Sequence, residues 1–276
     1  HLFGIQARQR LTMFGLHVVH TLLVFWLLRQ GLGAVGAAAA TVGFTLALHL
    51  ALPAGWLMAQ RSFPLPPGPL HDTIDEMAAA AGVGGLRVGV LRVAGWSTVV
   101  NAAVIGAVRP RLAVWDTLER LPLDEQQAII AHELGHLRRH HLRTRVAAAT
   151  VMAALGTAAA VAMMNDRMFG TGHTGDGDPH RYFGYRVTEI VVVLLLHQLV
   201  APWWRRQEHD ADLHALDTTR NAGAVRRAFV SLARANAVTG GASAVTSMGV
   251  HPSLAARLAA ADRWESDDAA AHLFDD

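Results

Sequence analysis

His132-Glu133-Leu134-Gly135-His136 is the stretch of this sequence that says most about its fold. Residues four apart lie one turn above each other on an α-helix, so the two imidazole rings can converge on one zinc ion. Such a site takes a third ligand from elsewhere and holds a water whose pKa the metal lowers to about 7. Glu133 stands beside the histidines and can accept that water's proton. The stretch predicts a zinc-dependent peptidase, although the same letters also occur by chance in helices whose histidines face solvent or core.

The residues around this stretch fit a helix. We expect Leu123-Asp124-Glu125 to form the N-terminal cap of the helix, with acidic residues in its first turn. One side of the segment is apolar, through Ala128, Ile129, Ile130, Leu134 and Leu137. We expect His140 and His141 to continue the helix as ordinary histidines, since no second set of metal-ligand spacings is visible.

A third ligand should be an acid or histidine further along the chain. The best candidate stands in Arg206-Gln207-Glu208-His209-Asp210-Ala211-Asp212, where Glu208 and Asp212 are again one helical turn apart. We interpret Glu208 as the ligand and Asp212 as the carboxylate that accepts a ring N–H from His132. Taken alone, this segment fits an acidic, solvated helix face. The HELGH stretch upstream favours the metal site.

Composition limits the class of protein. The 276 residues include no cysteine, so disulfides and thiolate metal sites are excluded, and any zinc must be held by His, Asp or Glu. All 24 basic residues are arginines, and the formal net charge of +2 argues against a nucleic-acid partner despite the high computed pI. Hydrophobic residues make up 52% of the chain and its mean hydropathy is positive, which indicates a membrane protein.

Four stretches are long and apolar enough to cross a bilayer, which takes about 20 residues. They run approximately over Leu11–Leu28, Ala34–Met58, Val146–Met164 and Val187–Trp204. The alternative for each is a buried core helix. Arginines cluster on the sides of these spans that hold the histidine and acidic segments, so we expect those sides to face the cytoplasm. The sequence thus predicts a multi-pass protein of the cell membrane, bacterial by composition, whose catalytic segments lie at the cytoplasmic surface.

The fold class that we expect is mainly α (α+β), a multi-span helical membrane protein with a catalytic domain that contains a small β-sheet. Transmembrane hairpins are expected over residues 1–60 and 146–204, and the two parts of the catalytic domain over 61–145 and 205–276.

The first catalytic part should hold one further helix and the small sheet. We predict an amphipathic helix over Asp72–Ala81 and strands over Leu86–Val93 and Arg111–Trp115, with Thr98–Asn101 as an edge strand. Such a sheet beside an HExxH helix commonly offers its edge to an extended peptide.

Several further segments resemble those of a known family, the integral-membrane zinc metallopeptidases that include the type 1 CAAX prenyl protease and the HtpX heat-shock protease. Besides HELGH, the similar segments are Asn101-Ala102 followed by Gly106, Trp115-Asp116-Thr117-Leu118, Glu208 to Asp212, and His251-Pro252-Ser253-Leu254-Ala255-Ala256-Arg257. The resemblance covers most of Pro64–Trp264. It implies a zincin-like, gluzincin-type catalytic domain that is split by a transmembrane hairpin and holds one zinc ion. The expected number of spans is closer to HtpX, whereas the DTL run is closer to the prenyl proteases.

The resemblance also implies roles for individual residues. Asn101 and Ala102 would bind the substrate backbone, and Glu133 would be the general base. His251 would stabilise the oxyanion of the transition state, and Arg257 would support that site or bind the substrate carbonyl. We therefore expect a zinc-dependent membrane endopeptidase that cleaves peptides or membrane proteins at the bilayer surface.

Two other functions fit parts of the sequence. A BlaR-type sensor-transducer also carries HExxH and a distant E-x-x-x-D. It needs an extracytoplasmic ligand-binding domain, which we do not expect here, because the sequence ends in an acidic, alanine-rich tail soon after Trp264. A non-catalytic membrane scaffold with a relic zinc site is the other alternative, and intact Glu133, Glu208 and Asp212 argue against it. As substrates, damaged membrane proteins suit the bacterial-looking composition better than prenylated proteins do.

Overall fold

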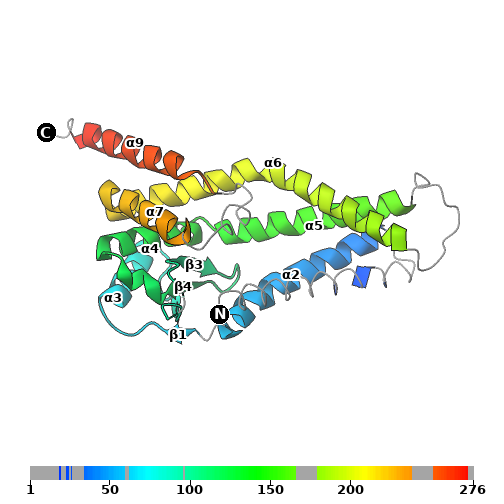
Figure 1. Ribbon diagram of the computed structural model, residues 1–276, viewed down its shortest axis with the longest axis horizontal. Coiled ribbons are helices and arrows are strands. Elements are labelled where there is room, and N and C mark those ends of the chain that lie inside the picture. Colours follow the sequence, from blue (N-terminus) through cyan, green and yellow to red (C-terminus); the bar gives the residue numbers. More distant parts are fainter. Residues whose placement is uncertain are drawn as a thin grey trace. The chain divides into compact units, whose positions relative to one another are not determined.

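The computed structural model describes residues 19, 23, 24, 26, 34–59, 62–95, 97–165, 179–237 and 251–272. This described part is mainly helical and contains one four-stranded sheet, which confirms the expected α+β class (Figure 1). The chain divides into two compact units, each made of two segments. Unit 1 comprises His1–Ala51 and Thr144–Val200, and unit 2 comprises Leu52–Arg143 and Ala201–Asp276.

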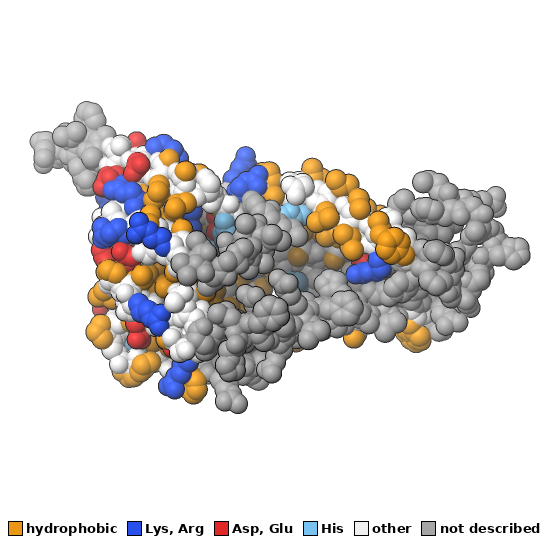
Figure 2. Space-filling model, in the orientation of Figure 1, with side chains coloured by type: hydrophobic (Ala, Val, Ile, Leu, Met, Phe, Trp, Pro, Cys, Tyr) orange, Lys and Arg blue, Asp and Glu red, His pale blue; other side chains and the backbone are white. Residues whose placement is uncertain are grey.

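The apolar helices lie mostly in unit 1. It holds most of α2 (Ala34–Ala59), most of α5 (His141–Asn165) and the first half of α6 (Pro179–Thr219). Two helical stretches are long and apolar enough to cross a membrane, His141–Ala162 and Arg186–Thr219, and Val35–Ala51 is a shorter apolar helix. The expected span over Leu11–Leu28 lies largely outside the described residues. Large apolar side chains stay exposed along α6, such as Ile190, Leu195 and Leu199 (Figure 2). An exposed apolar surface of this kind is typical of helices that contact lipid.

Small and polar residues join the helices of unit 1. A Cβ atom added at Gly156 would lie 2.7 Å from Val193 Cγ2 and 3.3 Å from the Glu189 carbonyl oxygen, so the glycine favours the close approach of α5 and α6. The hydroxyl groups of Thr41 and Thr157 lie 3.1 Å apart, and Thr157 donates to Glu189 Oε1 at 3.1 Å. These buried contacts link α2, α5 and α6.

Unit 2 is built on a sheet with the strand order β1-β2-β4-β3. The strands are β1 (Phe63–Pro64), β2 (Arg87–Leu91), β3 (Ala102–Ile105) and β4 (Arg111–Trp115). The central pair, β2 and β4, is parallel, and the two outer strands are antiparallel to their neighbours. The predicted strand over Arg111–Trp115 matches β4, and the predicted strand over Leu86–Val93 contains β2.

The edge strand lies further along the chain than expected. Thr98–Asn101 is not a strand, and β3 begins at Ala102. Side chains form hydrogen bonds with the backbone groups of Val99 instead: its N–H donates to Ser97 Oγ, and its carbonyl accepts from Thr117 Oγ1. The prediction was therefore wrong in position, because the glycines on either side of the segment do not reveal which backbone groups are already hydrogen-bonded.

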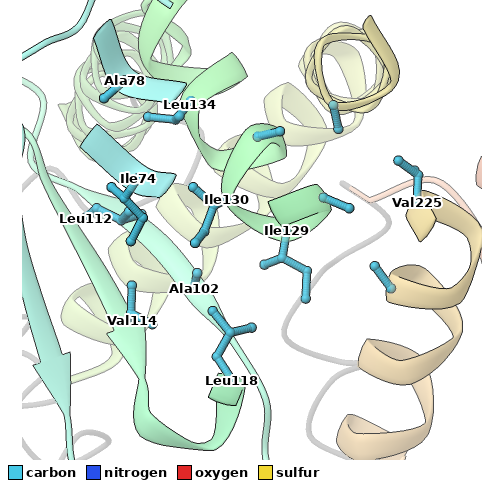
Figure 3. Packing of buried hydrophobic residues seen from close by; sticks show 14 of the residues in the cluster. Ile74, Ala78, Ala102, Leu112, Val114, Leu118, Ile129, Ile130, Leu134 and Val225 are labelled. Carbon is cyan, nitrogen blue, oxygen red and sulfur yellow. The ribbon is translucent and has the colours of Figure 1, made fainter. Parts of the chain in front are cut away.

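Helices cover the sheet and enclose the core of unit 2. They are α3 (Pro69–Ala80), the 3-10 helix η1 (Asp116–Arg120), α4 (Leu123–Arg138), α7 (Ala222–Ala237) and α9 (Leu254–His272). Helix α4 packs against α3, α7 and β3, and α7 also packs against α9. The largest buried side chains lie where α4 meets α3 and the sheet, among them Ile74, Leu112, Ile130 and Leu134 (Figure 3). This packing fixes α4, the helix that carries the HELGH stretch.

The N-terminal cap and the C-terminal end of α4 both differ from the prediction. The helix begins at Leu123, its capping residue is Pro122 rather than the predicted Leu123-Asp124-Glu125, and no side chain caps it. It ends at Arg138 rather than continuing through His140 and His141. His140 adopts a left-handed conformation with φ of 56°, which ends the helix, and α5 begins at His141.

Candidate metal centre

Three buried side chains from α4 and α6 meet in unit 2. His132 and His136 lie one turn apart on α4, and Glu208 comes from the second half of α6. The two Nε2 atoms lie 3.2 Å apart. The Glu208 carboxylate oxygens lie 3.5 Å from His136 Nε2 and 3.8 Å from His132 Nε2. The two histidines and the acid that the sequence predicts as ligands are therefore brought together.

The arrangement fits a zinc ion. Zinc bonds of about 2.0–2.2 Å in tetrahedral geometry place ligand atoms about 3.3–3.5 Å apart. The three observed separations, 3.2, 3.5 and 3.8 Å, lie close to that range. Two imidazoles and one carboxylate also form a donor set that catalytic zinc sites use, with a fourth position left for water or substrate.

Gly135, between the two histidines, allows α4 and α6 to approach each other. A Cβ atom there would lie 3.0 Å from His214 Cβ and 3.1 Å from Ala211 Cα, both on α6. The second of these atoms belongs to the backbone and cannot rotate away. A side chain at this position would therefore separate the histidines from Glu208.

The outer ring nitrogen of His132 contacts a charged pair. Its Nδ1 lies 2.8 Å from Asp212 Oδ1, and Arg257 Nε donates to Asp212 Oδ2 at 2.9 Å. Arg257 makes a second bond to the same carboxylate and stacks on Phe229, with its Cζ 3.6 Å from the ring centroid. Burial lowers the pKa of His132, but the hydrogen bond and charge of Asp212 outweigh this effect, so that the pKa is raised.

The outer ring nitrogen of His136 contacts another histidine. Its Nδ1 lies 2.9 Å from His141 Nδ1, at the start of α5, and both residues are buried. Sequence reasoning missed this contact because it placed His141 on a continuous helix, five residues beyond His136.

Glu133 is held by the edge of the sheet. Its Oε2 accepts a hydrogen bond from the backbone N–H of Val104 at 2.9 Å. Burial raises the pKa of Glu133, the charge of His132 and the Val104 bond oppose this effect, and the pKa remains raised. A carboxylate of raised pKa is suited to accept a proton during catalysis. No sequence signal could have indicated the Val104 contact, since it involves a backbone group.

The edge strand β3 begins with the predicted substrate-binding residues. Asn101 directly precedes the strand, and Ala102 is its first residue. The carbonyl of Asn101 accepts the N–H of Trp115 on β4. Because backbone groups alternate along an antiparallel strand, those of Ala102 and Val104 point away from β4.

His251 contacts Glu208, the third candidate ligand. Its Nδ1 is 2.6 Å from Glu208 Oε2, and its side chain is 55% exposed. The resemblance had implied a place for it beside the substrate oxyanion. His251 contacts Glu208, and Arg257 contacts Asp212, which contacts His132. His251 and Arg257 thus belong to one cluster with the two α4 histidines.

Comparison with known proteins identifies the family. Residues 64–265 match peptidase family M48. The fold is similar to the crystal structure of S. mikatae Ste24p, with a TM-score of 0.60 and 22% sequence identity. That match covers 82% of this chain and 56% of Ste24p, so the chain spans little more than half of that protein. A search of curated proteins finds no match. The family match covers most of the residues, and the chain therefore belongs to peptidase family M48, the metallopeptidase membership that the sequence resemblance predicts.

Proposed function

We propose that this chain is a zinc-dependent endopeptidase with one zinc ion per chain, held by His132, His136 and Glu208. The observation that carries the proposal is the convergence of these three buried side chains at separations of 3.2–3.8 Å, with Glu133 next to them in the sequence. Zinc in such a site supplies a Lewis acid that lowers the pKa of a water molecule and polarises a carbonyl group.

The residues around the site divide the remaining work. Glu133, oriented by the Val104 N–H, accepts the proton of the attacking water and passes it to the leaving amine. We assign oxyanion stabilisation to His251, whose exposed side chain can reach a substrate carbonyl. Arg257 supports His132 through Asp212. The substrate backbone pairs with the edge of the sheet at Asn101 and Ala102.

We propose that the substrates are peptides or membrane proteins and that the chain is a multi-pass membrane protein with its site at the cytoplasmic surface. Apolar helices and the exposed apolar side chains of α6 support insertion. Exposed arginines flank these helices next to the catalytic segments, namely Arg138, Arg139, Arg205 and Arg206. Cytoplasmic loops favour such residues. In this arrangement, two transmembrane hairpins over residues 1–60 and 146–204 alternate with the two catalytic parts over 61–145 and 205–276.

The variant Glu133→Gln tests this mechanism. The amide keeps the size of the side chain but cannot accept a proton, so zinc content should stay at one ion per chain while cleavage of casein falls by about 10²–10⁴-fold or more. Glu76→Gln, at an exposed glutamate of α3, is the matched control and should keep full activity. Undiminished proteolysis by metal-replete Glu133→Gln protein would refute the mechanism. An unmodified chain that binds zinc without cleaving any protein would instead support a relic site.

The same variant can identify substrates. Because it should bind peptides without cleaving them, substrates remain associated and can be identified by mass spectrometry after purification from membranes. Captured proteins that the unmodified chain then cleaves in vitro would define the substrate class. Captured proteins that it leaves intact would contradict a proteolytic role toward them.

A further inference from the structure

The contact between His136 and His141 has the geometry of a hydrogen bond between two imidazole rings. The two Nδ1 atoms lie 2.9 Å apart, and the residues are 6% and 4% exposed. At this distance one nitrogen must donate a proton and the other must accept it. Which one donates depends on what the second nitrogen of each ring does.

The candidate metal centre decides the direction of this bond. His136 Nε2 lies 3.2 Å from His132 Nε2 and 3.5 Å from Glu208 Oε1, which places it among the candidate ligand atoms. A ligating imidazole offers its lone pair at that nitrogen and therefore carries its proton on the other one. His136 Nδ1 is then the donor, and His141 Nδ1 is the acceptor.

A break in the helix makes the contact possible. On a continuous α-helix of 3.6 residues per turn, residues five apart are rotated by about 140° and face different sides. Here α4 ends at Arg138, His140 takes a φ of 56°, and α5 starts at His141. The break is closed by the bond from His140 N to Leu137 O at 3.0 Å. This interruption lets the first residue of α5 meet a ring in the last turn of α4.

We infer that His141 is a positioning residue for the metal site: its Nδ1 accepts a hydrogen bond from the Nδ1–H of His136 and holds that ring in the tautomer and orientation that leave Nε2 free to bind zinc. The inference rests on the zinc site proposed above. Partners of this kind typically change metal affinity by about 10–100-fold when removed.

Three variants of the full chain, purified in detergent, test the inference. His141→Leu keeps an apolar side chain but has no hydrogen-bond acceptor. His141→Asn keeps an acceptor, because its Oδ1 lies two bonds from Cβ, as Nδ1 does in histidine. His140→Asn makes the same exchange at the exposed neighbouring residue. Asparagine tolerates the left-handed conformation of residue 140. The zinc dissociation constant is measured by competition with a chelator, and the melting temperature of each zinc-free protein is recorded in parallel.

We expect His141→Leu to weaken zinc binding about 10–100-fold, while His141→Asn recovers most of the affinity and His140→Asn matches the unmodified chain. The zinc-free melting temperatures should stay together, which a purely structural role would not give. If His141→Leu does not fold, His141→Phe replaces it with the same expected loss. Equal zinc affinity in the Leu or Phe variant, or equal losses in the Leu and Asn variants, would overturn the inference. An unmodified chain that binds no zinc would instead refute the zinc site itself.

Discussion

His132 and His136 lie one turn apart on α4 and face the same point, yet the surroundings of their outer nitrogens differ. His132 meets Asp212, whose carboxylate is held by Arg257, whereas His136 meets the imidazole of His141. A carboxylate makes a ligating imidazole more basic, while a neutral acceptor fixes the ring without adding charge. One side of the site therefore offers both charge and orientation, and the other offers orientation alone. Variants on the two sides should therefore differ in size of effect on zinc affinity.

The largest effect is expected for Asp212→Ala. It removes the acceptor of His132 and leaves the 15% exposed guanidinium of Arg257 without its carboxylate. We expect zinc affinity to fall by about 100-fold and the free energy of unfolding of the zinc-free protein to fall by about 3–5 kcal/mol. Chelator competition and denaturant unfolding measure the two quantities.

Asp210→Ala is the matched control for this change. Asp210 lies on the same helix and pairs with Arg139 at 3.5 Å, but half of the Arg139 side chain is exposed. Exposed pairs contribute about 0–1 kcal/mol, so this variant should change little. Similar results for the two alanine variants would show that Asp212 does not support the site.

A smaller loss is expected for Arg257→Met, which keeps contact with Phe229 but removes both hydrogen bonds to Asp212. We expect zinc affinity to fall by about 10-fold. Because Arg257 acts through Asp212, the double variant with Asp212→Asn should lose less affinity than the two single losses combined. Independent, additive losses in this double-mutant cycle would indicate that Arg257 acts directly on the substrate or metal.

The change Gly135→Ala should affect both histidines together. Its Cβ would press on Ala211 Cα and His214, and overpacking of this kind costs about 1–3 kcal/mol. We expect a loss of zinc affinity of a few-fold, because α4 moves away from Glu208 while both outer partners remain. Gly95→Ala is the control, since the added Cβ meets no atom within 4 Å. If Gly135→Ala melts and binds zinc as the control does, the close approach of the two helices is not needed.

The smallest effect on zinc affinity is expected for His251→Asn. More than half of the His251 side chain is exposed, and Glu208 can bind a metal without it. Cleavage should nevertheless slow by about 10²–10³-fold if His251 stabilises the oxyanion. Steady-state kinetics and the zinc dissociation constant separate these effects. A variant that loses zinc but keeps its turnover number when saturated with metal would assign His251 to the metal site instead.

Regular patterns made much of unit 2 predictable. The apolar side of α4 and the short apolar run Arg111–Trp115 are clear local signals, and a helix and a strand occur there, although α4 ends earlier than expected. The pairing of HELGH with Glu208 and Asp212 could be inferred because both segments have helical spacing and chemically matched side chains.

Other features depend on contacts that no local pattern records. The two residues of β1 are too few to alternate, and one is a proline. The start of β3 depends on side chains that bind the backbone of Val99. The left-handed conformation of His140 is uncommon for a residue other than glycine, and it separates His141 from the helix that the sequence suggests. Tertiary contacts decide such details, so a single sequence cannot reveal them.

The bond from Val104 N–H to Glu133 has a consequence for the choice of cleavage site. It ties Glu133, the proposed proton acceptor, to one position of β3, and the outward backbone groups of that strand recur every second residue. A substrate paired with this edge can slide only in steps of two residues, about 7 Å. The bond to be cut would then be selected by distance along the backbone rather than by one recognised side chain, which would suit an enzyme that degrades proteins of many sequences.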